Sequence, residues 1–304
     1  MKKLFYSQKL APYVFILPFV LTVIFFWAVP IANGVLLSFQ DVLQDKWVGL
    51  DNYKRLLSDK IFLKALANST RYMIGTLVLL IPFPMFFATL LNSKLMKKPG
   101  FFKSIYFLPA LTSVVVAGTI FRLMFGEMET SLANQVIGMF GLGPIKWLKN
   151  DLTGYFALLL LACWRWTGVN ILYFLAGLQS ISTDLYEAAS IDGANKWQIF
   201  WKITMPYVLF ICGPSLIQSV IANINNFNVI YLLTGSTTTS NMAFANSNAK
   251  ETDLLITWLF TLTNDNSNYK MASVIGIISF VICALLTLLS YTRMISGDKE
   301  EVYQ

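Results

Sequence analysis

The sequence has 304 residues, of which 56% are hydrophobic and only 13% are charged, and its net charge is +7. Soluble domains carry about 25% charged residues, so a chain with a mean hydropathy of +0.60 has too little polar surface to face water and is an integral membrane protein. Its positive charges gather in short segments beside apolar runs, which is typical of membrane topology signals and argues against a nucleic-acid partner.

The first apolar run, residues 11–37, follows an N-terminal stretch with three lysines. A helix needs about 20 apolar residues to cross a bilayer, so this run predicts a first span, which Pro18 and Pro30 are expected to kink. A cleavable signal peptide has a shorter apolar part of about 7–15 residues, so we expect this span to be retained. After a charged loop over residues 41–64, the uncharged run 72–93 predicts the second span.

The rest of the chain predicts four more spans. A loop with four lysines and no acidic residue separates the second span from the third. In the mixed loop over residues 122–151, the apolar piece 131–145 is too short to cross and is expected to form an interfacial helix and a turn. A polar loop is predicted over residues 234–270, before the last span. Spans three to six are predicted at residues 104–121, 152–179, 203–232 and 271–292.

The lysines of the short loops set the orientation of the chain. They lie at the N-terminus and after the second span, whereas the loops after the first and third spans are close to neutral. The positive-inside rule therefore places the N-terminus in the cytoplasm, and six spans return the C-terminus to the same side. The sequence thus predicts an all-α, polytopic membrane bundle of six transmembrane helices in a single domain, residues 1–304.

Between spans four and five, residues 182–206 form a polar segment that this orientation places in the cytoplasm. Ser182 can cap a first helix, and Gly193 fits the left-handed residue that ends one. Asn195 and Gln198 make a capping-box pattern that opens a second helix. That second helix has one aromatic face, formed by Trp197, Phe200 and Trp201. The segment is therefore predicted to be a helix, a tight turn and a second helix at the membrane surface.

One pattern of residues in this segment is specific. It consists, in order, of Glu187, Ala188 and Ala189, then Gly193 after three residues, Ile203 after nine more, and Met205 and Pro206 after one. This pattern resembles the EAA motif of ABC importer permeases, and its IDGA sequence is similar to the carbohydrate-uptake branch. Two positions depart from the family, which usually has Leu in place of Met205 and often has a second Pro in place of Phe210.

The resemblance extends over about residues 10–293 and implies a type I ABC importer permease (MetI-like) fold, with its core at about residues 68–293. It implies that the chain forms half of the translocation pore of an ATP-driven importer for a sugar, an oligosaccharide, in the bacterial cell membrane. The implied partners are a second permease subunit that completes a heterodimer, two ABC ATPase subunits that bind ATP and Mg²⁺, and an extracellular solute-binding protein. The resemblance implies no cofactor and no catalysis in this chain.

In that family a cytoplasmic coupling segment, here residues 182–202, seats in a cleft of the ATPase and acts as a lever. The resemblance implies that Glu187 is its polar anchor and that Gly193 makes its turn. Two alanines between them would allow another backbone to approach closely. The implied ATPase-coupling set is Glu187, Ala188, Ala189, Asp192 and Gly193. Without the spacing match, Glu187 would be better explained as a solvated carboxylate in the first helical turn.

Span five carries polar residues at helical spacing. Ser219, Asn223 and Asn226 share one face, and their hydroxyl and amide groups suit a sugar because each can donate and accept hydrogen bonds. Residues 226–235 resemble the maltose-type permeases, in which the corresponding Ser and two Asn face the sugar. The alternative is that these groups hydrogen-bond between helices.

Span four offers Trp164, Trp166 and Asn170 as further substrate-binding candidates, since sugars commonly stack on an aromatic ring beside a polar group. Trp also anchors helices at membrane interfaces, and the maltose-type pattern has no Trp or Arg here. Arg165 lies deep in the span and is expected either to contact substrate or to face the partner subunit. Residues 125–134 resemble permeases for arabinose-containing oligosaccharides.

Several residues and motifs that are common in catalytic and metal sites are missing from the sequence. It contains no His, which excludes Ser-His-Asp and Cys-His catalytic sites and His-based metal sites. It has no Gly-Lys dipeptide and therefore no phosphate-binding P-loop. Cys163, Cys212 and Cys283 lie in apolar runs without a CxxC pair and are expected to be small buried residues. We predict no catalytic residue, no metal site and no cofactor in this chain.

Three other functions are alternatives to a sugar permease. A permease for a polyamine or glycerol phosphate would need a charged pore lining, whereas the polar candidates named above are neutral apart from Arg165. A secondary transporter would need intramembrane carboxylates for ion coupling, and none of the six predicted spans contains Asp or Glu. A membrane glycosyltransferase would need an acidic metal-binding pair near an interface, which the sequence lacks.

Overall fold

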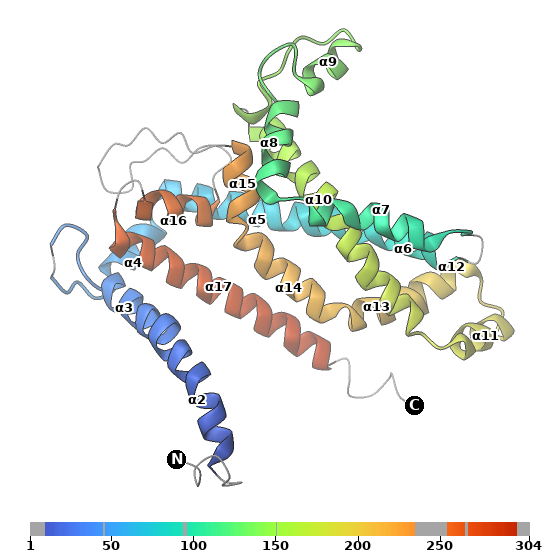
Figure 1. The fold of residues 1–304 in the computed structure, drawn as a ribbon, viewed down its shortest axis with the longest axis horizontal. Coiled ribbons are helices and arrows are strands. Elements are labelled where there is room, and N and C mark those ends of the chain that lie inside the picture. The colour runs from blue at the N-terminus through green and yellow to red at the C-terminus, as the bar shows by residue number, and fades with distance from the viewer. Residues whose placement is uncertain are drawn as a thin grey trace.

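The computed structural model describes residues 10–44, 46–93, 96–149, 151–234, 254–264 and 267–296. Among these residues, four continuous helices are long and apolar enough to cross a membrane, and two bent helix pairs raise the candidate spans to six if each pair counts as one. The predicted all-α membrane bundle is thus confirmed (Figure 1). In chain order the described helices are α2 (Ala11–Val23), η1 (Ile24–Ala28), α3 (Val29–Ser38), α4 (Asp51–Leu57), α5 (Lys60–Leu80), α6 (Pro82–Asn92), α7 (Pro99–Leu111), α8 (Val114–Met124), α9 (Leu132–Gly138), η2 (Trp147–Lys149), α10 (Asp151–Gln179), α11 (Thr183–Ile191), α12 (Lys196–Ile199), η3 (Phe200–Thr204), α13 (Met205–Ile211), α14 (Gly213–Ile224), α15 (Phe227–Thr234), α16 (Leu255–Asn264) and α17 (Tyr269–Ser296).

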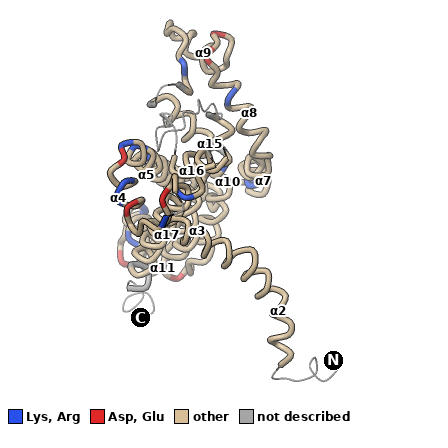
Figure 2. The backbone as a smooth tube through the Cα atoms, turned by 90° about the vertical axis from the view of Figure 1, so that its left-hand side faces the viewer, with Lys and Arg blue, Asp and Glu red and all other residues tan. Residues whose placement is uncertain are grey.

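The first span is one continuous helix made of α2, η1 and α3. Its middle section, η1, is a π-helical turn directly before Pro30. Proline lacks a backbone N–H and its ring crowds the carbonyl group four residues earlier, so the helix widens there without ending. α3 packs along α17, whereas α2 extends away from the other helices (Figure 2).

The second span, α5 and α6, begins at Lys60, twelve residues before the predicted start at residue 72. Asp59 caps α5 by accepting a hydrogen bond from the Ile61 N–H at 2.6 Å. The additional turns are buried, because Phe62 packs in a cluster with residues of α4, α16 and α17. The hydrophobic run therefore marked only the uncharged part of a longer helix.

The prediction of a polar loop over residues 234–270 is wrong for residues 255–264, which form the apolar helix α16. Leu255 and Trp258 of this helix are buried against α5 and α17. Its first turn is capped from α5, where Ser69 Oγ accepts a hydrogen bond from the Leu255 N–H at 2.9 Å. Ten residues are too few to cross a membrane, so a search for spans passes over the apolar run of α16, and its cap lies far away in the sequence.

The third span is bent, although a single run over residues 104–121 was predicted. α7 and α8 meet at 89° across Thr112 and Ser113, whose backbones are extended. Pro109, in the last turn of α7, has no backbone N–H to donate, which weakens the helix just before the bend. Beyond the bend α8 packs on α15, while α7 packs on α10.

The fifth span is also bent, and it runs from Lys196 to Ile224, so it begins and ends earlier than the predicted run 203–232. The helix formed by α12, η3 and α13 meets α14 at 61° near Cys212, and α15 is a separate helix after a break at Asn225 and Asn226. Cys212 Sγ lies 3.3 Å from the Tyr173 carbonyl oxygen of α10. α10 is the central helix, since it contacts α5, α6, α7, α8, α13 and α15.

The loop between α8 and α10 contains the short helix and the turn that were predicted there, α9 and a turn at Gly141. The buried Asn134 joins the two ends of this loop. Its Nδ2 donates to the carbonyl oxygens of Met128 at 3.0 Å and Ile145 at 3.2 Å, and its Oδ1 accepts from Trp147 Nε1 at 2.8 Å. A single amide therefore holds the connection in one conformation.

Candidate functional site

The coupling segment, residues 182–202, has the local structure predicted from its sequence. Ser182 Oγ accepts a hydrogen bond from the Asp184 N–H at the start of α11. Gly193 has a φ of +80°, which ends the helix in the left-handed conformation. Asn195 and Gln198 form a reciprocal capping box, with N–H to side-chain oxygen distances of 2.8 and 2.9 Å. These caps fix both helices of the segment without help from distant residues.

The tip of the coupling segment is exposed. Glu187, Ala188, Asp192 and Gly193 are exposed, and Ala189 is partly buried. Large apolar side chains surround them: Ile191 is 85% exposed and Trp197 is 70% exposed, and Leu185 and Trp201 are also exposed. Apolar surface beside carboxylates, on a segment that leaves the helical bundle, is typical of a surface that contacts another protein or the membrane.

One hydrogen bond joins the two helices of the coupling segment at their base. The Tyr186 hydroxyl of α11 lies 3.2 Å from Thr204 Oγ1 in η3. Thr204 is buried, and Tyr186 packs against a cluster that includes Leu178 of α10 and Val208 of α13. Tyr186 therefore connects α11 to the fifth span by a hydrogen bond and by packing.

Replacing Tyr186 with Phe is expected to remove this bond and to leave the ring in place. A hydrogen bond of this kind contributes about 1 kcal/mol. In the ATP-driven importer that the EAA-like pattern implies, the variant should therefore assemble but move roughly fivefold less solute per ATP hydrolysed. The ratio of uptake to ATP hydrolysis in proteoliposomes measures this. Tyr207→Phe is the matched control, since the hydroxyl of Tyr207 makes no hydrogen bond with the described residues. An unchanged ratio for Tyr186→Phe would remove the bond from the coupling path.

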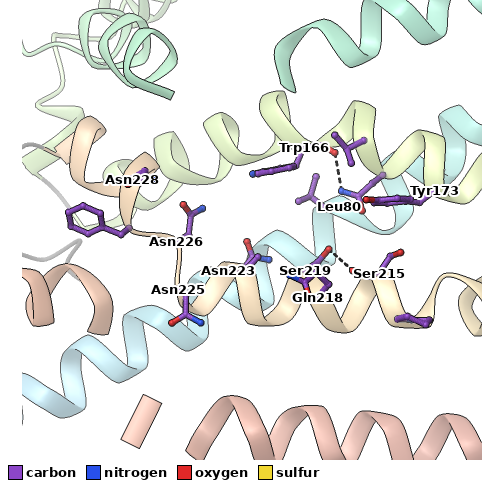
Figure 3. A pocket seen from close by; sticks show the side chains of 15 residues that line it. Leu80, Trp166, Tyr173, Ser215, Gln218, Ser219, Asn223, Asn225, Asn226 and Asn228 are labelled. Atoms are coloured by element: carbon purple, nitrogen blue, oxygen red, sulfur yellow. Dashed lines mark hydrogen bonds between the residues drawn. The ribbon is translucent and has the colours of Figure 1, made fainter. Parts of the chain in front are cut away.

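A cavity of about 620 Å³ lies between α10 and α14 and extends to the break after α14. None of its fifteen described lining residues is charged. In Figure 3, Ser219 and Asn223 rise from α14 towards Trp166 of α10, and Tyr173 lies further along α10. The amide side chains of the lining are Asn170, Gln218, Asn223, Asn225, Asn226 and Asn228.

These amides differ in how far the protein already uses their hydrogen-bonding groups. Asn226 Nδ2 donates to the Tyr72 hydroxyl at 2.9 Å, and Asn170 Nδ2 donates to the Trp166 carbonyl oxygen at 2.9 Å. Asn225 points towards α17, and its Nδ2 donates to the Ile221 carbonyl oxygen at 3.1 Å and lies 3.9 Å from Cys283 Sγ. Asn223 is buried, yet its amide makes no hydrogen bond with any described residue. Its donor and acceptor groups are therefore free for a ligand.

The structure brings together five of the six substrate-binding residues predicted from the sequence. Ser219, Asn223, Asn226, Trp166 and Asn170 all line the cavity. Asn226 reaches it from the break, because α14 ends at Ile224. The sixth candidate, Trp164, is not among the lining residues and packs on Phe121 of α8, with ring centroids 5.5 Å apart.

Five further polar lining residues were not predicted, among them Asn225 at the break after α14. Ser215 and Gln218 precede Ser219 by four and one residues on α14, and Tyr173 follows Asn170 by three on α10. A search for every polar residue three or four positions from the candidates would have found Ser215 and Tyr173, but not Gln218. Asn228 lies beyond the break in α15, so only the fold places it there.

Comparison with known proteins identifies the family. A family model described as "Binding-protein-dependent transport system inner membrane component" matches residues 10–296. The chain is 42% identical over 291 residues to the arabinooligosaccharides transport system permease protein AraP of Bacillus subtilis, covering 95% of this chain and 90% of AraP. It is 30% identical to the maltodextrin transport system permease protein MalC of Streptococcus pneumoniae, covering 96% and 71% of the two chains.

A solved structure has the same fold. A chain of a bacterial ABC transporter involved in the import of the acidic polysaccharide alginate matches with a TM-score of 0.74 over 93% of this chain and 94% of that chain, at 21% identity. The type of fold inferred from the EAA-like pattern is therefore confirmed. The chain is a multi-pass protein of the inner membrane, it is not a catalytic subunit, and the ATPase and the binding protein with which it works are separate. It belongs to the inner membrane components of binding-protein-dependent transport systems, the permeases of ABC importers.

Proposed function

We propose that this chain is one of two different permease subunits in an importer for an uncharged oligosaccharide. The complete importer would contain this permease domain, residues 1–304, a second permease, two ATPase subunits and an extracellular binding protein. The N- and C-termini would lie in the cytoplasm, in agreement with the distribution of lysines. The coupling segment would then face the ATPases.

The observation that carries this proposal is the uncharged, amide-rich cavity between α10 and α14. Its volume of about 620 Å³ is within the range of about 300–1,000 Å³ that is usual for small-molecule sites. Amides and hydroxyls match the hydroxyl groups of a sugar, and Trp166 and Tyr173 offer ring faces for stacking. The relatives named for arabinooligosaccharides and maltodextrin support a sugar chain as the solute.

A charged solute fits this cavity poorly. A polyamine or glycerol phosphate would lose its hydration without meeting an opposite charge, because every described lining residue is neutral. Glu187 and Asp192, the acidic residues of the coupling tip, lie in another part of the chain, on the exposed coupling segment. We therefore assign the acidic residues to partner binding and the amides to the solute.

The coupling role is supported by the continuity of the fifth span. The second helix of the coupling segment continues through η3 into α13, and α13 leads to α14, which lines the cavity. Pulling on the segment would therefore move one wall of the cavity. We propose that Glu187, Ala188, Ala189, Asp192 and Gly193 contact the ATPase and that Ser219, Asn223, Asn226, Asn170 and Trp166 contact the sugar.

Replacing Asn223 with Ala is expected to lower the maximal rate of arabinotriose uptake roughly fivefold, because one hydrogen bond to a neutral hydroxyl is worth about 1 kcal/mol. Assembly with the ATPase should not change. Uptake of radiolabelled arabinotriose into vesicles with a saturating amount of binding protein measures the effect. Asn33→Ala is the control, since Asn33 is an exposed amide of α3 outside the cavity. Equal rates for the two variants would exclude Asn223 from the solute path.

A further inference from the structure

Arg165 is a buried cation in the middle of the central helix. Only 9% of its surface is exposed, and it is the fifteenth of the 29 residues of α10. Among the residues that the structure describes, no carboxylate forms an ion pair with it. A charge at this depth is costly in a membrane and is retained mainly where it has a function.

The Arg165 guanidinium contacts the bend in the third span. Its Nη1 donates a hydrogen bond to the Thr112 carbonyl oxygen at 2.7 Å. Thr112 lies where α7 and α8 meet at 89°, and no described backbone N–H donates to this carbonyl group. A carbonyl group freed by a bend must find another donor in a membrane, and Arg165 provides it.

The same guanidinium also contacts a wall of the cavity. Its central carbon lies 5.7 Å from the ring centroid of Trp166, at a distance typical of a cation–π contact. Trp166 lines the cavity, whereas Arg165 is not among the lining residues. One side chain therefore joins the bend at Thr112 to an aromatic ring that faces the solute path.

We propose that Arg165 is a positioning residue, which holds the bend of the third span against α10 and thereby fixes the Trp166 ring in the cavity wall. This inference rests on the proposed transport function only in one respect, namely that Arg165 variants should change the rate of uptake. It differs from both roles expected from the sequence, which were direct contact with substrate and contact with a partner subunit. The planar guanidinium is needed because an ammonium can donate to the carbonyl group but cannot stack on the ring.

Hydrogen exchange tests the bend without any transport assay. Arg165→Met should accelerate amide exchange about tenfold in peptides that span residues 110–117, because the bend loses a charge-assisted hydrogen bond. Arg165→Lys should keep exchange close to that of the unmodified chain. Arg122→Met, which removes an exposed cation from α8, is the matched control and should change nothing at the bend. Unchanged exchange in Arg165→Met would overturn the proposal.

Uptake of arabinotriose by the whole importer tests the link to Trp166. Arg165→Met and Arg165→Lys should each lower the maximal rate about fivefold, and neither should lower it further in a Trp166→Leu background. Additive losses in the double variants would show that Arg165 acts independently of the ring and would overturn the proposal. If the unmodified importer does not transport arabinotriose, the proposed solute is wrong, and the exchange experiment still decides the role of Arg165.

Discussion

Replacing Glu187 with Lys is expected to abolish ATP-driven uptake while the chain still inserts and folds. Glu187 is exposed on α11, and its carboxylate makes no hydrogen bond or ion pair with the described residues. Charge reversal at such a position changes folding stability by only about 0.5 kcal/mol. If Glu187 contacts a cation on the ATPase, however, the variant places two like charges in a contact, which costs several kcal/mol.

The decisive measurement is co-purification of the ATPase with the tagged permease, followed by uptake into vesicles. Glu129→Lys is the matched control, because Glu129 is an exposed carboxylate between α8 and α9. We expect Glu129→Lys to retain the ATPase and Glu187→Lys to lose most of it. Normal recovery of the ATPase with Glu187→Lys would refute the assignment of the coupling segment.

Replacing Gly168 with Val is expected to prevent assembly of the helical bundle. A Cβ atom at this position would lie 1.8 Å from the Tyr106 carbonyl oxygen and 2.9 Å from the Phe107 backbone nitrogen. Both atoms belong to the backbone of α7, so the clash cannot be relieved by rotating a side chain. Separating α7 from α10 would cost about 3 kcal/mol or more, and it would also remove Thr112 from the reach of Arg165.

Even Gly168→Ala carries the offending Cβ atom and should lower the thermal stability of the solubilised protein. Gly100→Ala is the control in the same helix pair, since a Cβ atom on Gly100 of α7 would have no atom within 4 Å. Alanine there should be neutral or stabilise the helix by up to about 1 kcal/mol. Size-exclusion profiles after heating compare the two variants. Equal profiles would contradict the close contact between α7 and α10.

Local signals explain what the sequence could predict. The coupling segment has its caps within a few residues of one another, as Ser182 and the pair Asn195 and Gln198 show. The spans could be predicted because a helix that crosses a bilayer needs a long run of uncharged residues. Such features depend on neighbouring residues and on the solvent, and both can be judged from the sequence.

The bends depend on contacts between distant helices and were missed. The carbonyl group of Thr112 is satisfied by Arg165, 53 positions away. Pro109 marks a weak point in the third span, but the span's own residues do not show that it bends there. Contacts between distant helices also explain why only part of the cavity lining could be predicted. Ser219 and Asn223 were found by helical spacing, but Trp164 and Trp166, two positions apart, point about 200° apart around α10, and only packing shows which one faces the cavity.

The cap on α16 has a consequence for biogenesis. Ser69 is synthesised early, whereas the Leu255 N–H that it binds is translated 186 residues later. Phe62 and the other buried residues at the start of α5 therefore lack their packing partners on α16 and α17 for most of translation, although in the finished chain α5 and α16 lie side by side (Figure 1). A chain that ended before α16 would leave Ser69 Oγ and this face of α5 without the partners that cover them in the complete bundle.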